Sequence, residues 1–225
     1  MSNVLIIGAS RGLGLEFARQ YVAAGERVLA TARDAAGRER LQALGVESVL
    51  NVDVADPASV SGLAWMLDGE KIDTALYVAG VMDRGNALSP PTQQQFDRVM
   101  HTNVLGAMQA IPQVAPLVEA AQGRFAFISS SLGRIGEVES SHTWLYRVSK
   151  AALNMAVLAA QSAYPQASLV LLDPGWTQTD MGGASAPLTI EHSVQGLMQT
   201  LASVTPADRG CLLRHDGQRI RLCEA

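Results

Sequence analysis

Apolar positions along the chain form two kinds of segment that alternate. Short, nearly continuous apolar runs cover Val4–Ile7, Val28–Ala32, Ser48–Val52, Thr74–Val78, Arg124–Ser129 and Ser168–Leu172. Longer stretches with helical spacing of apolar residues cover Gly12–Ala24, Ala36–Leu44, Pro57–Leu67, Thr92–Ala121 and His142–Ala163. Continuous apolar runs are typical of parallel strands that helices bury on both faces. The alternation therefore predicts a doubly wound α/β fold.

Two segments interrupt this pattern. Pro112 and Pro116 fall inside the fourth helical region and predict that the helix ends or bends there, because proline lacks a backbone N–H and clashes with the preceding turn. The stretch Asp180–Leu188, rich in Gly, Ala and Ser, predicts a loop. No repeat or linker divides the 225 residues, so we expect one domain over residues 1–225.

Composition excludes several classes of function. The formal net charge is −4 and no basic block occurs, which disfavours a nucleic-acid partner. No apolar run approaches the roughly 20 residues that span a bilayer, and no basic leader precedes Val4. Cys211 and Cys223 show neither metal-ligand nor disulfide spacing. We expect a reduced, cytoplasmic protein without a metal or a membrane partner.

A glycine-rich segment follows the first apolar run. It reads Gly8-Ala9-Ser10-Arg11-Gly12-Leu13-Gly14 and leads into a helical pattern. Glycines let a backbone turn sharply and approach a ligand closely, and a helix N-terminus offers free N–H groups to a pyrophosphate. The spacing is G-x-x-x-G-x-G rather than G-x-G-x-x-G, and an ordinary tight turn is the alternative. Its place between the first strand and the first helix favours a dinucleotide site.

The end of the second apolar run indicates which dinucleotide binds. A carboxylate at this place holds the ribose 2′-hydroxyl of NAD, whereas an arginine suits the 2′-phosphate of NADP. Arg33 occupies the place and Arg11 adds a second positive charge, so we predict NADP(H). Asp34, one residue later, complicates this preference. Asp53 is either an acceptor for the adenine amino group or part of a helix cap within Asp53–Asp56.

A tyrosine and a lysine share one predicted helix face. Tyr146 and Lys150 are four residues apart, and residues at that spacing project from the same side of a helix. An ammonium beside a phenol favours the phenolate, so the pair is a plausible proton donor with a lowered tyrosine pKa. The alternative is a half-buried tyrosine with a lysine that reaches to solvent.

The motifs together resemble the short-chain dehydrogenase/reductase family. They occur in its order: the glycine loop, Ala79-Gly80, His101-Thr102-Asn103-Val104-Leu105-Gly106, Ile128-Ser129-Ser130, Tyr146-x-x-x-Lys150 and Pro174-Gly175-x-x-x-Thr179. The segments 146–155 and 174–183 are similar to a narrower group, the C-factor-like or sniffer-like carbonyl reductases. The resemblance implies a Rossmann fold with a mostly parallel, seven-stranded sheet. It also implies dimers or tetramers built on the helices Asn103–Leu117 and Arg147–Ala163.

The resemblance also implies roles for individual residues. Tyr146 would be the general acid in reduction and the base in oxidation, and Lys150 would lower its pKa and bind the nicotinamide ribose. Ser130, chosen over Ser129 and Ser131, would hydrogen-bond the substrate oxygen. Asn103 would hold a helix and a water that connects Lys150 to solvent. The cofactor would contact residues of the glycine loop and of four later segments: Gly8, Ser10, Arg11, Gly12, Leu13, Gly14, Arg33, Asp53, Val54, Ala79, Gly80, Asn103, Tyr146, Lys150, Pro174, Gly175, Thr177 and Thr179.

Two departures from the family pattern concern the site. The family's Asn-Asn-Ala-Gly is here Tyr77-Val78-Ala79-Gly80, which removes two asparagine side chains that support the strand. The segment from Ser130 to Tyr146 is longer than usual, with the extra length at Glu137–His142. We interpret His142 as a solvated loop residue rather than a catalytic one.

These patterns predict an NADP-dependent oxidoreductase that reduces a carbonyl or oxidises a secondary alcohol. A cofactor-sensing signalling protein, as C-factor-like proteins suggest, is the main alternative. A sugar-nucleotide epimerase or dehydratase shares Tyr-x-x-x-Lys, but needs a larger region after Pro174. No basic cluster lies near Asp180–Leu188, so charge gives no reason to expect an acidic substrate.

Overall fold

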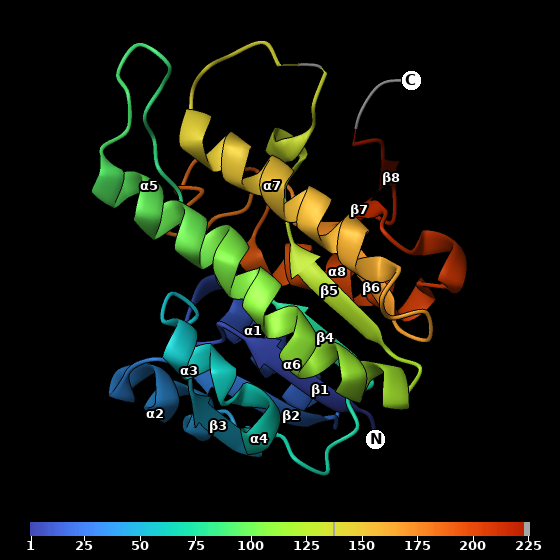
Figure 1. The fold of residues 1–225 in the computed structure, drawn as a ribbon. Helices are drawn as coiled ribbons and strands as arrows, with labels where there is room; N and C mark the ends of the chain where they lie inside the picture. The colour runs from blue at the N-terminus through green and yellow to red at the C-terminus, as the bar shows by residue number, and fades with distance from the viewer. Residues whose placement is uncertain (137, 223–225) are drawn as a thin grey trace.

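One β-sheet forms the centre of the molecule (Figure 1). The computed structural model describes residues 1–136 and 138–222, and within them the sheet has eight strands in the order β3-β2-β1-β4-β5-β6-β7-β8. All neighbouring strands are parallel except β7 and β8, which are antiparallel. The strands are β1 (Asn3–Ile7), β2 (Arg27–Ala32), β3 (Ser48–Asn51), β4 (Thr74–Tyr77), β5 (Arg124–Ile128), β6 (Ser168–Asp173), β7 (Leu212–Arg214) and β8 (Arg219–Ile220).

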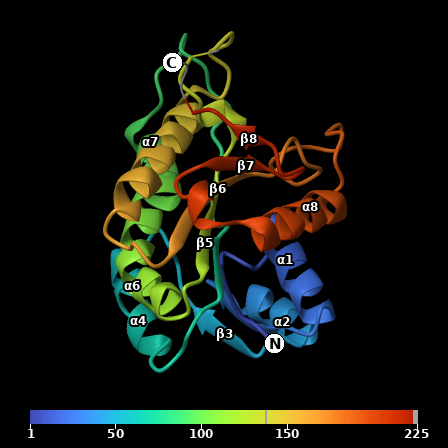
Figure 2. The ribbon, with the colours of Figure 1, turned by 90° about the vertical axis from the view of Figure 1, so that its right-hand side faces the viewer.

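Helices cover both faces of the sheet (Figure 2). One layer holds α1 (Gly12–Ala23), α2 (Ala35–Ala43) and α8 (Ile190–Ser203), and the other holds α3 (Pro57–Ser61), α4 (Leu63–Met66), α6 (Gly106–Ala120) and α7 (Trp144–Gln161). A further helix, α5 (Gln93–Met100), leads through a π-helical turn at His101–Leu105 into α6. The predicted doubly wound fold is confirmed, with eight described strands instead of seven.

Each face of the sheet has its own apolar core. Leu5 and Ile7 of β1 pack toward the α6–α7 layer with Val114 and Val157, all fully buried. Val4 and Ile6 face the α1–α8 layer with Phe17 and Leu197. Burial on both sides explains why the strands appear in the sequence as continuous apolar runs.

The helix does not end at Pro112 or Pro116, so that part of the prediction is wrong. Both prolines lie inside α6, which continues from Gly106 to Ala120. Each proline removes one helical hydrogen bond, but the apolar face of α6, including Ile111, Val114 and Ala115, is buried and stabilises the helix. The observed irregularity is the π-helical turn at His101–Leu105, one turn before α6 is regular.

The smaller elements differ from the prediction in length and number. The expected helix Pro57–Leu67 is divided into α3 and α4 at Gly62. Strands β7 and β8 and helix α8 were not predicted. The segment Asp180–Leu188 forms no helix or strand, as expected, apart from a bridge between Thr177 and Leu188. No helix in the described ranges has the length and apolar character that crossing a membrane requires.

The strand order predicts a ligand site at the carboxyl ends of the central strands β1 and β4. The chain moves outward from β1 to β2 and β3, then returns to β4 on the other side of β1. The loops after β1 and β4 therefore separate at the carboxyl ends of these strands. Doubly wound sheets bind ligands in the crevice at this reversal.

Candidate active site

A cavity of about 640 Å³ lies at the carboxyl ends of the strands. We call the part lined from the loops after β1, β2 and β3 the glycine-loop end. The part lined from α7 and from the loops after β4, β5 and β6 is the Tyr146 end. Every predicted site residue except Asn103 lines this cavity: Gly8, Ser10, Arg11, Gly12, Leu13, Gly14, Arg33, Asp53, Val54, Ala79, Gly80, Ser130, Tyr146, Lys150, Pro174, Gly175, Thr177 and Thr179.

Backbone contacts at the glycine loop leave no room for side chains. Gly8 has a φ of +87°, and a Cβ there would lie 2.7 Å from the Ala79 nitrogen. A Cβ on Gly14 would lie 2.2 Å from the carbonyl oxygen of Gly8. Arg11 precedes α1 and its side chain does not cap the helix, so the first N–H groups stay free for a ligand. A pyrophosphate fits such a cradle, because its oxygens accept from backbone amides at a helix N-terminus.

The charges beside this loop favour a phosphate over a ribose hydroxyl. Arg33 is exposed and lines the cavity together with Arg11. Asp34, unlike Arg33, does not line the cavity, and its Oδ1 accepts from the Gly37 nitrogen at 2.7 Å and caps α2. The complication that Asp34 raised in the sequence is therefore removed by its capping role.

Within Asp53–Asp56 the helix cap is Asp56, and the contact of Asp53 with the adenine stays a prediction. Asp56 caps α3, since its Oδ1 accepts from the Ala58 nitrogen at 3.0 Å. Asp53 lines the cavity, with its Oδ1 accepting from the Ala55 nitrogen at 3.0 Å. The rest of the Asp53 carboxylate is available to a ligand at the glycine-loop end.

Tyr146 and Lys150 lie one turn apart in α7 and are both buried, with exposures of 6% and 3%. Lys150 Nζ donates to the Ile128 carbonyl at 2.8 Å and lies 5.5 Å from the centre of the Tyr146 ring. The Ser130 hydroxyl accepts from the Leu132 nitrogen at 3.1 Å and lines the cavity with Tyr146. Ser129 is occupied elsewhere, because its hydroxyl donates to Asn154 at 2.5 Å. Ser129, Ser130 and Ser131 all line the cavity, and the choice of Ser130 stays a prediction.

The expected lowering of the Tyr146 pKa is wrong for this arrangement. Burial raises the pKa of Tyr146, and the charge of Asp173 raises it further, while the hydrogen bond from Ser130 lowers it. Burial also lowers the pKa of Lys150 to about 8, opposed by Asp173. The sequence shows the Tyr146–Lys150 spacing but not the loss of hydration, which outweighs the attraction between them. A protonated phenol is the form that can donate a proton.

Asn103 lies behind the cavity rather than in it, contrary to its predicted cofactor contact. It is fully buried in the π-helical turn, where its Nδ2 donates to the Val81 carbonyl and to Ser149 Oγ, both at 2.9 Å. Its Oδ1 accepts from the Val81 nitrogen at 2.8 Å. Asn103 therefore fixes the chain after Gly80 against the helix residue next to Lys150.

Tyr77 compensates for one asparagine that the family pattern has after β4. Its hydroxyl donates to the Thr102 carbonyl at 2.7 Å, inside the π-helical turn. Gly106 makes room, since a Cβ there would lie 2.6 Å from the Tyr77 hydroxyl. The substitution thus supports the turn that holds Asn103.

Asp173 is a site residue that the sequence analysis missed. It ends β6, is 3% exposed and lines the cavity. Its Oδ2 accepts from the Ser131 nitrogen at 3.1 Å and its Oδ1 from the Gly175 nitrogen at 3.0 Å. The carboxylate therefore joins the loop that carries Ser130 to the loop that begins at Pro174. Its position directly before Pro174-Gly175 was the only signal in the sequence.

Three further residues border the Tyr146 end. Trp176 is 58% exposed and lines the cavity, and its Nε1 donates to the Gly182 carbonyl at 2.8 Å. Met181 lines the same end. His142 lines it too, although it is exposed, as expected of a loop residue. Glu137, at the start of the longer segment, lies outside the described residues.

Comparison with known proteins identifies relatives for most of the chain. The family model described as short chain dehydrogenase matches residues 2–187. The 1-hydroxy-2-glutathionyl-2-methyl-3-butene dehydrogenase of Rhodococcus sp. (strain AD45) is 32% identical over 228 residues, covering 96% of this chain and 98% of the relative. C-signal of Myxococcus xanthus is 32% identical over 66% of this chain and 92% of its own length.

Solved structures with the same fold include two carbonyl reductases. Sniffer of D. melanogaster has a TM-score of 0.90 at 25% identity, covering 98% of this chain and 99% of that one. A carbonyl reductase from Pseudomonas aeruginosa PAO1 in complex with NADP has a TM-score of 0.85 at 30% identity, with the same coverage.

Proposed function

The chain belongs to the short-chain dehydrogenase family, and on this premise we propose that it reduces a carbonyl compound with NADPH and oxidises the corresponding alcohol with NADP⁺. The observation that carries the proposal is one cavity in which Ser130, Tyr146 and Lys150 lie at one end and a glycine loop at the other. Membership in the family makes the chain an NAD(P)-dependent oxidoreductase; the direction and the choice of NADP are the proposed parts.

The residues of the Tyr146 end perform the proton chemistry. When bound, the nicotinamide cofactor supplies the hydride. Ser130 donates a hydrogen bond to the carbonyl oxygen, where negative charge develops, and the Tyr146 hydroxyl gives that oxygen its proton. Lys150 holds positive charge beside the phenolate that remains and is placed to bind the nicotinamide ribose. In alcohol oxidation the phenolate takes the proton back.

The preference for NADP rests on the glycine-loop end. Arg33 and Arg11 present positive charge there, and Asp34 is committed to capping α2. The P. aeruginosa carbonyl reductase, which was solved with NADP, is a structural neighbour and supports the same choice. We propose that the 2′-phosphate of NADP lies between Arg33 and Arg11.

Calorimetric titration of the cofactor-free protein tests this assignment. We expect NADPH to bind at least tenfold more tightly than NADH, which corresponds to about 1.4 kcal/mol. Arg33→Asp should reduce or reverse the ratio, while Arg98→Gln, which removes a cation that does not line the cavity, should leave it unchanged. An unchanged ratio in Arg33→Asp would disprove the role of Arg33.

A cofactor-sensing signalling role is the second candidate, and the similarity to C-signal favours it. A sensor requires the glycine loop but not a complete proton-donating end. Steady-state assays with NADPH and a panel of aldehydes and ketones separate the two candidates. Turnover of at least one carbonyl compound supports the reductase, whereas tight NADPH binding without turnover across the panel supports the sensor.

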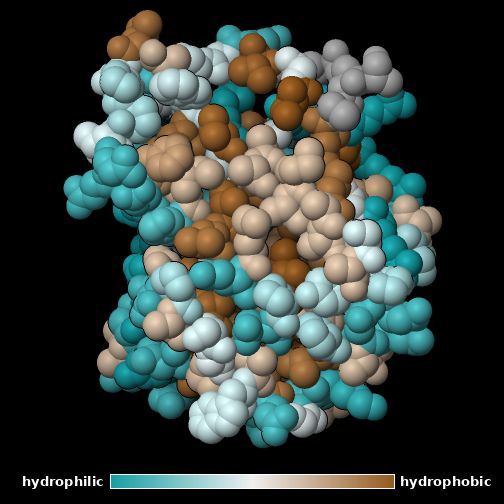
Figure 3. All heavy atoms as spheres, viewed as in Figure 1, coloured by the Kyte–Doolittle hydropathy of each residue, from teal (hydrophilic) through white to brown (hydrophobic). Residues whose placement is uncertain are grey.

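Exposed apolar side chains on the α6–α7 layer suggest how the chain associates. Figure 3 shows apolar surface over these helices, where Met108, Val148, Met155 and Leu158 are exposed. A contiguous apolar face of this kind is typical of a subunit interface. We propose a homodimer or homotetramer formed through it. Met155→Glu, at a side chain that is 66% exposed, should lower the mass measured by light scattering after gel filtration.

A further inference from the structure

Two arginine side chains at the Tyr146 end have no carboxylate partner among the described residues. Arg84, in the loop after β4, donates from Nη2 to the Met181 carbonyl at 2.8 Å. Arg147 follows Tyr146 in α7 and donates from Nε to the His142 carbonyl at 2.9 Å. Both side chains line the cavity.

Nearby carboxylates are already engaged. Asp173 accepts from the Ser131 and Gly175 nitrogens. Asp180, in the loop after β6, has a side chain that is 90% exposed and lies 3.8 Å from Arg11. The salt bridges found in residues 1–136 and 138–222 do not include Arg84 or Arg147. Among the described residues, Arg84 and Arg147 therefore line the cavity without a carboxylate in an ion pair with either of them.

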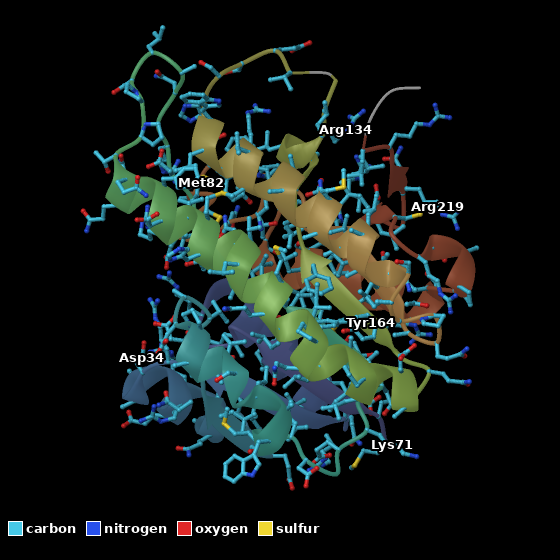
Figure 4. All side chains as sticks on the ribbon, viewed as in Figure 1. Asp34, Lys71, Met82, Arg134, Tyr164 and Arg219 are labelled. Atoms are coloured by element: carbon cyan, nitrogen blue, oxygen red, sulfur yellow. The ribbon has the colours of Figure 1, made fainter. Side chains whose placement is uncertain are left out.

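The two arginines reach the cavity from different elements. Arg147 is adjacent to Tyr146 in α7, and Arg84 connects the loop after β4 to the loop that carries Met181. Figure 4 shows Met82, two residues before Arg84, beside α5 and the first turns of α7. A guanidinium has five N–H donors, and one from each arginine is used in these backbone contacts. The remaining donors can form charge-assisted hydrogen bonds to an anion.

We propose that the substrate is a carbonyl compound with an anionic group, a carboxylate in particular, that Arg84 and Arg147 bind while the carbonyl faces Tyr146. This substrate class rests on the proposed reductase function. No pattern in the sequence predicts this substrate class, because the two arginines come from segments far apart in the chain and only the fold brings them to one cavity.

Matched aldehydes test the proposal. Rates with NADPH are measured for 4-formylbenzoate and for its methyl ester, whose aldehyde is intrinsically the more electrophilic. We expect kcat/KM of the wild-type enzyme to favour the carboxylate at least tenfold, mainly through KM, and to lose this preference as salt rises. Equal kcat/KM values, or a preference for the ester, would overturn the proposal.

Variants separate the charge from the loop contacts. Arg84→Gln and Arg147→Gln keep a side-chain amide that can donate to the same backbone carbonyls but remove the charge. Each should lower the carboxylate-to-ester ratio at least fivefold while the rate with the ester stays within about threefold. Arg98→Gln removes an equal charge outside the cavity and should leave the ratio unchanged. If all three variants changed the carboxylate-to-ester ratio equally, specific binding of the carboxylate by Arg84 and Arg147 would be contradicted.

A binding measurement keeps the proposal testable if neither aldehyde turns over. Calorimetry compares 4-(hydroxymethyl)benzoate and its methyl ester on the protein saturated with NADP⁺. At least tenfold tighter binding of the carboxylate, lost in Arg147→Gln, supports the anion site even where reductase activity fails. Equal binding of the two ligands refutes the anion site, whether or not the enzyme reduces aldehydes.

Discussion

The glycine-loop end of the cavity is built mainly by backbone, whereas the Tyr146 end is built by side chains from distant segments. At the first end, seven consecutive residues from Gly8 to Gly14 form most of the cradle, and missing Cβ atoms decide its shape. At the second end, Ser130, Tyr146 and Asp173 come from the loop after β5, from α7 and from the end of β6. The glycine-loop end suits one cofactor, because its shape depends on the backbone. Substitutions of side chains at the Tyr146 end can change which substrate that end accepts.

Removing the ammonium at the Tyr146 end should have the largest effect on activity. We expect Lys150→Met to lower kcat/KM for reduction by at least about 10³, because proton transfer loses the adjacent charge. Burial depresses the pKa of Lys150 to about 8, so its charge costs folding free energy at pH 7. The free energy of unfolding of Lys150→Met, measured in urea, should therefore not fall. It should rise by up to about 3 kcal/mol, since a shift of one pKa unit corresponds to about 1.4 kcal/mol.

Lys71→Met is the control for that substitution, because Lys71 is exposed and does not line the cavity. It should change neither rate nor stability. A Lys150→Met protein that is strongly destabilised yet retains activity would contradict this prediction, because Lys150 would then stabilise the fold rather than assist catalysis.

Adding a methyl group at the glycine-loop end should weaken cofactor binding while leaving the side chains of the Tyr146 end in place. In Gly14→Ala the new Cβ would meet the Gly8 carbonyl oxygen at 2.2 Å, so the loop must shift. We expect NADPH affinity to fall about 100-fold, or about 2.7 kcal/mol, in a calorimetric titration. Gly62→Ala is the matched control, because Gly62 has a φ of −84° and only the end of Met66 within 4 Å. It should bind NADPH normally, and a loss of affinity there would contradict the steric explanation.

Asp173→Asn tests how the Tyr146 end sets its pH dependence. Asp173 raises the pKa of Lys150 against the effect of burial, so loss of its charge should lower that pKa below about 8. In the wild-type enzyme kcat/KM for reduction should fall above about pH 8 as Lys150 loses its proton, and in Asp173→Asn the fall should begin at lower pH. The rate at neutral pH should also drop about tenfold, because an amide cannot accept from both the Ser131 and Gly175 nitrogens.

Asp208→Asn separates this effect from general destabilisation. Asp208 is another buried carboxylate, bonded to Thr205 and Arg219 outside the cavity. Its loss should lower the melting temperature without moving the pH profile. A profile that Asp173→Asn leaves unmoved would show that Asp173 acts only as a structural link.

The smallest effect is expected at the π-helical turn, which holds Asn103 behind the cavity. Tyr77→Phe leaves the Thr102 carbonyl without its 2.7 Å hydrogen bond and should lower the free energy of unfolding by about 1 kcal/mol. Activity should fall two- to threefold at most, because Asn103 keeps its own bonds to Val81. Tyr164→Phe is the control: Tyr164 lies near the end of α7 (Figure 4), and its hydroxyl forms no hydrogen bond within the described residues. Equal losses of stability in both variants would contradict a stabilising role for the hydrogen bond between Tyr77 and the Thr102 carbonyl.

The sequence predicted local features better than those that arise from tertiary packing. Continuous apolar runs located six strands, and the glycine spacing located one end of the cavity, because both depend on neighbours in the chain. Strands β7 and β8 span three and two residues, too short to show a period. The helix through Pro112 and Pro116 persists because tertiary burial outweighs local propensity.

At the Tyr146 end the sequence predicted several of the residues that line the cavity, but not how buried they are or which charges surround them. The spacing of Tyr146 and Lys150 is local, and the structure places both beside Ser130. Their pKa values depend on burial and on Asp173, which lies more than twenty residues away in the chain. The same limitation hid the positive charge that Arg84 and Arg147 share. The roles of these residues in catalysis and binding stay predictions.

Tyr146→Phe tests the central claim most directly, because it removes one oxygen and keeps the ring that packs in α7. Calorimetry and steady-state reduction are measured on the same preparations of wild-type and variant protein. We predict that the Kd for NADPH stays within about threefold, while kcat/KM for the carbonyl substrate falls by at least about 10². A variant that binds NADPH normally and still reduces the substrate at close to the wild-type rate would contradict the account of Tyr146 as the proton donor.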